Sequence, residues 1–182
     1  ARELGGAGLR APSRVLLLVQ STQGYLNLSE LLSRGWIQNV QRNQALLKQE
    51  WMQELSEGLI CLSGMQFGPL GQALAAGDRP RALEWAQRLS AIYPGRFYVE
   101  LQRAGLAGQE ALVRQLVPLA AELQLPVVAT HPIQFLSEED FDAHEARVCI
   151  AEGETLANPK RVKRFLPGQY FKTQAEMEAL FA

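Results

Sequence analysis

Short β-branched or aromatic runs alternate with helical patterns along the chain, and this alternation constrains the fold more than any other feature. The predicted strands are Val15 to Gln20, Leu59 to Ser63, Phe97 to Gln102 and Val127 to Thr130. Parallel strands need a long return connection, which is usually a helix. The order therefore predicts an α/β fold with parallel strands and crossover helices. So few strands leave an open doubly wound sheet and an incomplete barrel as equal alternatives.

Polar residues at fixed spacing predict where the helices begin. The pairs with capping-box spacing are Asn27 with Glu30, Ser137 with Asp140, and Thr173 with Glu176. Asp78 followed by Pro80 predicts another helix start. Pro118 lies inside a further helical pattern and is expected to kink it.

The composition is that of an ordinary globular domain. The 182 residues are 47% apolar and 20% charged, and the net charge of −1 gives no global field toward DNA or acidic lipid. The longest apolar run, Val15 to Val19, is far shorter than the roughly 20 residues that cross a bilayer, so we expect a cytoplasmic protein with no membrane partner. Cys61 and Cys149 belong to no CxxC motif and are expected to be buried packing residues.

The loop after the last predicted strand occupies the usual place of an active site in these folds. It carries His131, Pro132 and Gln134 at the carboxyl end of a parallel strand. Proline has no side-chain donor or acceptor, and a glutamine amide is a poor ligand for catalytic divalent metals. A single imidazole remains, which favours a hydrogen-bonded structural histidine over a metal ligand.

Two further acidic segments have candidate metal ligands. Asp142 and His144 are two residues apart on a predicted helix and point in different directions, so His144 is expected to pack rather than to share an ion. The period of two in FYVELQ places Glu100 opposite the face formed by the apolar residues. Pairing of Glu100 with a basic residue such as Arg103 is favoured over a metal.

One segment is basic, with no acidic residue between Glu154 and Glu176. Its cations are Lys160, Arg161, Lys163, Arg164 and Lys172. A solvated or domain-junction segment is favoured over contact with phosphate. The sequence has no Gly-rich phosphate cradle and no GxSxG or HExxH motif.

Several segments, in order, carry a family resemblance over nearly the whole chain. GYLNLSELLSRG, EGLICLSG, RFYVELQR and LPVVATHPIQFLSEEDFDAHEARVCI resemble the PHP domain of bacterial DNA polymerase III alpha subunits, the replicative C-family polymerases. The resemblance implies an incomplete, distorted (β/α)7 barrel. It also implies an irregular segment at 1–14, the C-terminal part of the PHP domain at 15–155, and a junction toward the polymerase core at 156–182. Because the chain starts at Ala1 with a loose segment, we expect it to be a piece of a longer protein.

The resemblance also implies a degenerate metal site. Active members of the family hold several metal ions through His, Asp, Glu and Cys at the strand ends. Here Met65 stands where metal-binding relatives have Cys, Pro132 and Gln134 replace a late Asp-x-His motif, and an early His-x-His segment has no counterpart. Only His131 and Glu100 remain as candidates, and clustered cations need more anionic and imidazole ligands than that. We expect no catalytic residue, metal or other cofactor in this chain.

By resemblance, the chain is part of a DNA-directed DNA polymerase, a nucleotidyltransferase. Its expected role is a non-catalytic platform that docks the proofreading exonuclease, the epsilon subunit. Magnesium is implied only for the polymerase active site, which lies outside this chain. The implied partners are the rest of the alpha chain, the epsilon subunit, and DNA through the intact polymerase. The alternatives are a metal-dependent PHP phosphoesterase or proofreading domain, and direct nucleic-acid binding through Lys160, Arg161, Lys163 and Arg164.

Overall fold

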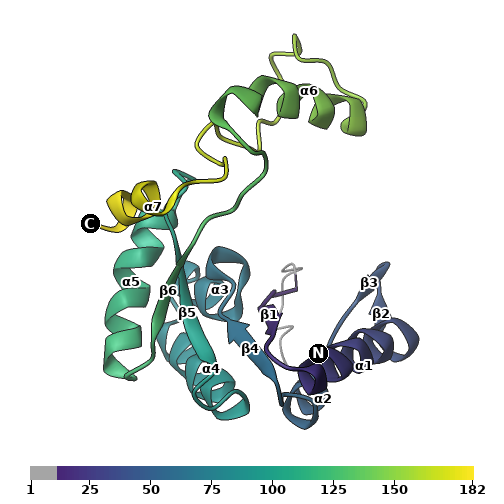
Figure 1. Cartoon of the computed structure of the whole chain (residues 1–182), viewed down its shortest axis with the longest axis vertical. Helices are drawn as coiled ribbons and strands as arrows, with labels where there is room; N and C mark the ends of the chain where they lie inside the picture. Colours follow the sequence, from purple (N-terminus) through teal and green to yellow (C-terminus); the bar gives the residue numbers. More distant parts are fainter. Residues whose placement is uncertain (1–11) are drawn as a thin grey trace. The chain divides into compact units, whose positions relative to one another are not determined.

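A parallel strand pair joined by helices lies at the centre of the sheet. The computed structural model describes residues 12–182. The four-stranded sheet has the order β1-β4-β5-β6, with β1 at Leu16–Val19, β4 at Leu59–Leu62, β5 at Phe97–Gln102 and β6 at Val127–Thr130 (Figure 1). β4 and β5 pair in parallel, with Cys61 opposite Phe97. Helices α3 (Pro69–Ala75) and α4 (Arg79–Ile92) form the crossover between them, which confirms the predicted α/β class.

The first strand differs from the prediction of a parallel sheet. β1 pairs antiparallel to β4, with Leu16 opposite Leu62. The connection between the two strands contains α1 (Thr22–Gln38), a β-hairpin and α2 (Gln49–Glu54). A connection of several elements can return to either end of a sheet, so alternation of strands and helices does not fix the direction of the next strand.

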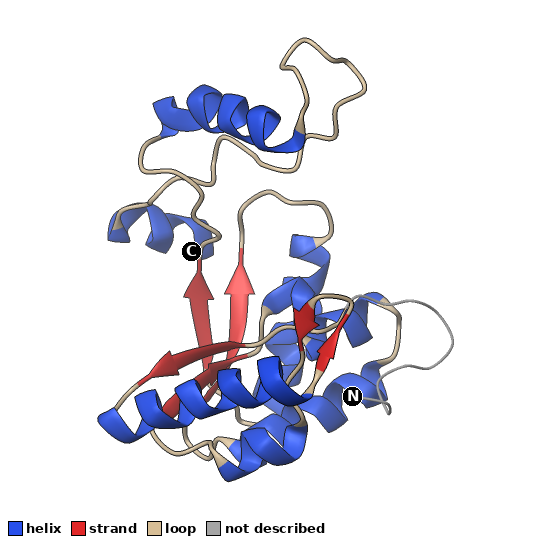
Figure 2. Cartoon of the chain, turned by 90° about the vertical axis from the view of Figure 1, so that its right-hand side faces the viewer, coloured by secondary structure: helices blue, strands red, loops and turns tan. Residues whose placement is uncertain are grey.

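The β-hairpin in this connection was not predicted. It consists of β2 (Val40–Gln41) and β3 (Gln44–Ala45), which pair antiparallel (Figure 2). The two turn residues, Arg42 and Asn43, have φ of 50° and 60°. Positive φ at both central positions is the type I′ arrangement, whose twist matches that of two-residue hairpins.

Most predicted helix starts are confirmed, with one correction. α4 begins after Asp78, whose side chain accepts the N–H of Arg81. Capping boxes are present before α6 (Phe141–Glu152), where the 3-10 turn η3 (Glu138–Asp140) intervenes, and before α7 (Gln174–Phe181). The prediction for Asn27 was wrong. The cap of α1 is Ser21, six residues earlier. The buried Asn27 lies on the inner face of the helix, and its amide donates to the carbonyl of Glu57.

The chain forms two compact units. Unit 1 comprises residues up to 100 and residues 115–128, and unit 2 comprises residues 101–114 and 129–182. Helix α5 (Gln109–Glu122), which runs through Pro118, and strands β5 and β6 contribute residues to both units. In unit 1, fully buried side chains such as Leu31, Leu70 and Leu89 form the core. In residues 12–182 we find no helix with the length and apolar character that a membrane crossing requires.

Candidate functional site

Glu100 is buried on β5 and its carboxylate binds the backbone. Its Oε2 accepts the N–H of Gly64 at 3.0 Å, and its own N–H donates to Oγ of Ser63 at 2.9 Å. A main-chain partner of this kind was not predicted from the sequence. The guanidinium of Arg103, the predicted partner, pairs with the carboxylate of Glu110 and donates to the carbonyl of Leu180. The Glu100 carboxylate therefore helps to fix the turn at the end of β4.

Met65 follows that turn and belongs to the core of unit 1. Gly64 has φ of 80°, and a Cβ at this position would lie 2.0 Å from the carbonyl oxygen of Arg14, so only glycine fits. Met65 itself has φ of 43° and begins the 3-10 helix η2 (Met65–Phe67). Its side chain is 1% exposed. A buried thioether packs well but cannot supply the anionic ligand that a cysteine thiolate would provide.

His131 uses one ring nitrogen in a structural contact. Its Nε2 lies 2.7 Å from the carbonyl oxygen of Gly168, which acts only as an acceptor, so we assign the proton to Nε2. Nδ1 is buried and has no hydrogen-bond partner among the described residues. Desolvation lowers the pKa of His131, with Lys172 adding to the effect. The ring is therefore a neutral donor with one unused acceptor nitrogen.

Pro132 and Gln134 belong to a loop that is fixed through its main chain. The carbonyl of Pro132 accepts from the Gln169 amide at 3.1 Å, and the N–H of Gln134 donates to the carbonyl of Gln169 at 2.8 Å. Phe135 forms a parallel bridge with Tyr170. The Gln134 side chain is exposed. The loop after β6 is thus built as a scaffold around segment 166–171.

These residues do not fit a multinuclear metal cluster. Within residues 12–182, no group of three or more His, Cys, Asp or Glu side chains could hold a metal ion. One carboxylate oxygen of Glu100 accepts a backbone N–H, and within the described part of the chain only one ring nitrogen of His131 is free of a hydrogen bond and could bind a metal. Both cysteines are free and buried, as predicted, and burial raises the pKa of the Cys61 thiol to about 12. A thiol that stays protonated is neither a good ligand nor a nucleophile.

The segment around His144 is structural, as predicted. The His144 ring contacts Phe135 and packs edge-on against Phe165, with centroids 5.3 Å and 4.8 Å away. Its neighbour Glu145 accepts from the Arg161 guanidinium at 2.5 Å, and both side chains of this ion pair are 5% exposed. Hydrogen bonding to Glu145 raises the pKa of Arg161. Because adjacent residues on α6 point to different partners, the pattern Asp-x-His-Glu does not converge on one ion.

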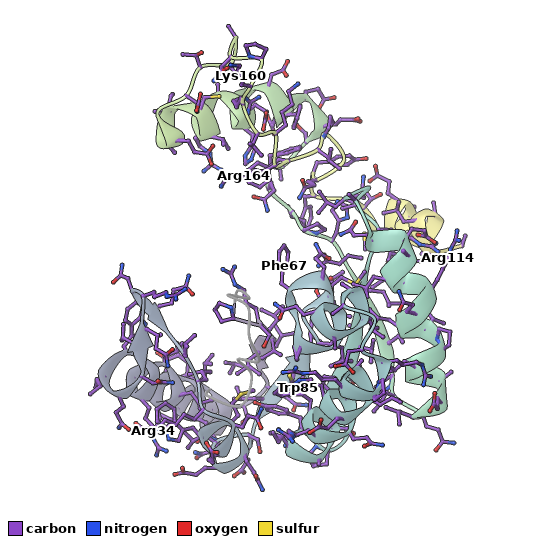
Figure 3. All side chains as sticks on the ribbon, turned by 180° about the vertical axis from the view of Figure 1, so that it is seen from behind. Arg34, Phe67, Trp85, Arg114, Lys160 and Arg164 are labelled. Atoms are coloured by element: carbon purple, nitrogen blue, oxygen red, sulfur yellow. The ribbon has the colours of Figure 1, made fainter. Side chains whose placement is uncertain are left out.

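The basic segment contains cations of two kinds. Arg161 is buried against Glu145, and Lys172 lies over the ring of Tyr170 at 3.6 Å. Arg164 pairs with Glu152 at 3.0 Å, although its side chain is 62% exposed. Lys160 and Lys163 are exposed, and Lys160 and Arg164 lie on the loop that follows α6 (Figure 3). The burial of Arg161 could not be foreseen, because its partner is 16 residues away.

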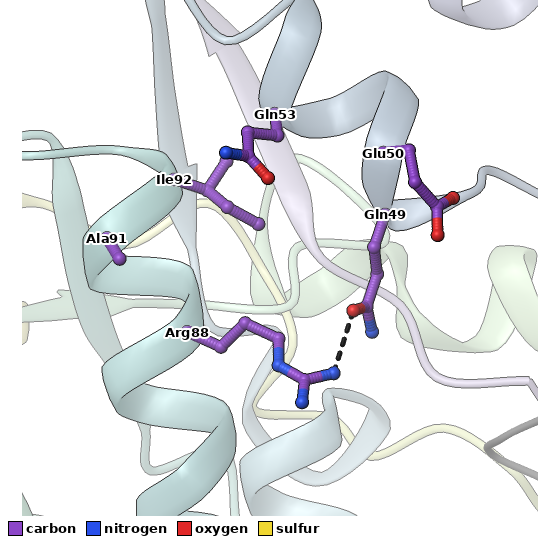
Figure 4. Close-up of a pocket in the computed structure, with 6 residues that line it drawn as sticks. All are labelled: Gln49, Glu50, Gln53, Arg88, Ala91 and Ile92. Carbon is purple, nitrogen blue, oxygen red and sulfur yellow. Dashed lines mark hydrogen bonds between the residues drawn. The ribbon is translucent and has the colours of Figure 1, made fainter.

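A shallow pocket lies between α2 and α4, in unit 1. It has a volume of about 270 Å³ and is lined by Gln49, Glu50, Gln53, Arg88, Ala91 and Ile92. The Arg88 guanidinium is already bound to the Gln49 amide oxygen at 2.8 Å (Figure 4). It also binds the Glu84 carboxylate at 2.7 Å. Two of its donors are therefore already used within the protein, and we assign no function to this pocket.

Comparison with known proteins identifies relatives over nearly the whole chain. A family model described as the PHP domain matches residues 3–104. The chain is 41% identical over 170 residues to the DNA polymerase III subunit alpha of Pseudomonas aeruginosa, covering 93% of this chain and 14% of that protein. Proteins of the same name from Neisseria meningitidis serogroup B (46% over 176 residues) and Escherichia coli K12 (36% over 170 residues) cover 94% and 93% of this chain. The chain spans 14% to 15% of the length of these relatives.

Proposed function

Because the chain belongs to the PHP domain family, we propose that it is part of the alpha subunit of a bacterial DNA polymerase III, where it acts as a structural platform. The observation that supports this most is the match of 93% of the chain to proteins of that name. In this proposal, the intact polypeptide is a DNA-directed DNA polymerase and the sheet is an incomplete distorted (β/α)7 barrel. Nucleotide transfer and its magnesium ions belong to a polymerase core outside this chain, in the bacterial cytoplasm where the chromosome lies.

The donor set supports a non-catalytic role for this region. A cluster of adjacent cations needs several anionic or imidazole ligands to offset their mutual repulsion. Met65, Pro132 and Gln134 provide none, and Glu100 and His131 are engaged with Gly64 and Gly168. These residues therefore give no support to a hydrolytic step that depends on clustered metal ions.

Elemental analysis of the full-length alpha subunit that carries this chain tests the platform role. We expect less than one tightly bound transition metal ion per polypeptide after dialysis against buffer without chelator. A subunit from the same preparation should still polymerise DNA when magnesium is supplied. Two or more bound ions per polypeptide, together with a phosphate-ester hydrolysis activity that disappears when these ions are removed, would refute the platform role. That result would favour a metal-dependent phosphoesterase.

The phosphoesterase remains the second candidate because of one observation. Nδ1 of His131 is buried, carries a lone pair and has no partner among the described residues, at the end of β6 where ligands are found in such folds. His131→Gln should leave the metal content unchanged if the platform proposal is correct. A fall in bound metal in this variant would support the phosphoesterase instead.

Docking of the proofreading exonuclease, the epsilon subunit, is the partner that we propose for the platform. Gel filtration of the full-length alpha subunit mixed with the exonuclease should give a stable complex. A deletion of the region that corresponds to this chain should abolish the complex. Polymerase activity on a primed template is the control, because a deletion variant that has misfolded would lose this activity as well. Undiminished complex formation after the deletion would refute docking here.

A further inference from the structure

The loop after α6 carries a cluster of cations, of which two make no ion pair among the residues that the structure describes. This basic loop, residues 155–165, contains Lys160, Arg161, Lys163 and Arg164, and the nearest acidic residues in the sequence are Glu154 and Glu176. The chain as a whole has a net charge of −1, so the positive charge here is local. A local cluster of one sign creates its own field at short range.

The loop is held in place by contacts within unit 2. Arg161 is buried against Glu145, and Arg164 reaches Glu152 on the last turn of α6. Asn158 donates to the Glu154 carboxylate at 2.8 Å and accepts the N–H of Lys160 at 3.0 Å. These contacts fix the backbone on both sides of Lys160, so the exposed cations are presented from an ordered loop.

The remaining cations face solvent. Lys160 and Lys163 are exposed, and neither has an acidic partner within 4.0 Å among the residues that the structure describes. The Arg164 side chain is 62% exposed, so its guanidinium keeps donors that face solvent although one donor binds Glu152. Val162 and Leu156 are the exposed large apolar side chains that the structure describes on the basic loop, at 69% and 57% exposed.

We propose that the basic loop binds the phosphate backbone of DNA through Lys160 and Lys163, with Arg164 beside them. The inference rests on the proposed function, since a part of a DNA polymerase works next to DNA. Lysine ammonium groups bind phosphate as point charges and need no base-specific geometry. A protein partner fits less well, because the buried centre of a protein interface is apolar and depleted of charge. The loop offers two exposed large apolar side chains, Leu156 and Val162, beside three exposed cations.

Salt dependence of DNA affinity tests the inference in the full-length alpha subunit. Binding to a fluorescent primed duplex would be measured by anisotropy over a range of salt concentrations for the wild type and for Lys160→Gln/Lys163→Gln. Each phosphate contact contributes about −0.9 to the slope of log affinity against log salt, so we expect the slope to become shallower by about 1.8. The Lys160→Arg/Lys163→Arg variant keeps both charges and should keep the wild-type slope.

A matched control removes two exposed charges elsewhere. Arg42→Gln/Arg114→Gln makes the same change in net charge on the β2–β3 turn and on α5, and should leave the slope unchanged. An unchanged slope in Lys160→Gln/Lys163→Gln would overturn the inference. So would loss of the exonuclease complex with an unchanged DNA slope, which would assign the loop to a protein partner. Primer extension by the wild-type subunit distinguishes failure of the proposed function from failure of this inference. A wild-type subunit that extends no primer is not a DNA polymerase.

Discussion

At the level of single residues, the two ring nitrogens of His131 have unequal surroundings. Nε2 donates to the Gly168 carbonyl, whereas Nδ1 is buried without a partner. Protonation would place a second N–H at Nδ1 with no acceptor and would add a positive charge near Lys172. Desolvation and this charge both lower the pKa of His131, so the folded protein favours the neutral ring.

The lowered pKa of His131 predicts a loss of stability on acidification. In the unfolded chain a histidine takes up its proton at a pH of about 6.5, whereas the folded protein resists that proton. The unfolded state therefore binds more protons below this pH, and the free energy of unfolding should fall as the pH drops below about 6.5 and stay level just above it. Urea unfolding at several pH values between 5 and 8 measures the effect. His131→Gln should remove this part of the pH dependence, and an identical pH profile in both proteins would contradict the assignment.

Gly24 lies where α1 approaches the backbone of Gly58. A Cβ at Gly24 would lie 1.9 Å from the carbonyl oxygen of Gly58, which belongs to the loop before β4. Alanine normally favours a helix, but here the clash is with backbone, which cannot rotate away. We expect Gly24→Ala to lower the free energy of unfolding by about 1–3 kcal/mol or more, as overpacking does.

Gly77→Ala is the matched control for this substitution. Gly77 has φ of +74° and no atom within 4 Å of an added Cβ. Alanine there should cost only about 1–2 kcal/mol, from the left-handed backbone. Urea unfolding of both variants would decide the matter, and a smaller loss for Gly24→Ala than for Gly77→Ala would show that the α1 contact can relax.

At the level of elements, local chemistry could be predicted and distant pairing could not. The caps of α4, α6 and α7 are confirmed because a capping residue and its partner are three residues apart. Asn27 has the same local pattern, but its amide binds a carbonyl 30 residues away. The antiparallel direction of β1 and the Glu145–Arg161 pair likewise depend on contacts between separate segments. The β2–β3 hairpin did have a local signal in the sequence, because Asn43 in its turn is a residue type that tolerates positive φ.

The cap of α7 predicts a second, more acidic transition. Glu176 accepts from the Tyr170 hydroxyl and from the backbone and side chain of Thr173, and these bonds lower its pKa to about 2. Because the folded pKa is depressed, the stabilisation is complete at neutral pH and is lost as the pH falls from about 4.5 toward 2. Amide hydrogen exchange of α7 should accelerate over that range. Glu176→Ala, which removes the acceptor, should show fast exchange already at neutral pH, and equal protection in both proteins would contradict this role of the cap.

At the level of the whole molecule, apolar burial is unevenly distributed between the units. Buried apolar side chains of unit 1 come from α1, α2, α3, α4, α5, η2, β4 and β5. In residues 129–182 of unit 2, Cys149 is the buried apolar residue among those that the structure describes. This segment is held by polar contacts, such as Glu145–Arg161 and the two hydrogen bonds of the Gln169 side-chain amide, and by ring contacts of the half-buried Phe135, Phe141 and Phe165. The overall hydrophobic content of the sequence gives no indication of this division, because half-buried leucines occur in both units.

The uneven burial predicts that unit 2 opens before unit 1. Hydrophobic burial supplies most of the free energy that resists opening, so native-state hydrogen exchange should give lower protection for α6 and α7 than for α3 and α4. Glu145→Gln leaves the buried Arg161 without its counterion and should lower protection in α6 while α4 is unchanged. Leu89→Ala is the reciprocal control, because deleting this buried side chain should lower protection in α4 by about 2–5 kcal/mol. Equal loss of protection in α4 and α6 after Glu145→Gln would mean that the chain opens as one cooperative body, and the polar contacts of unit 2 would then be as important to its stability as the apolar core of unit 1.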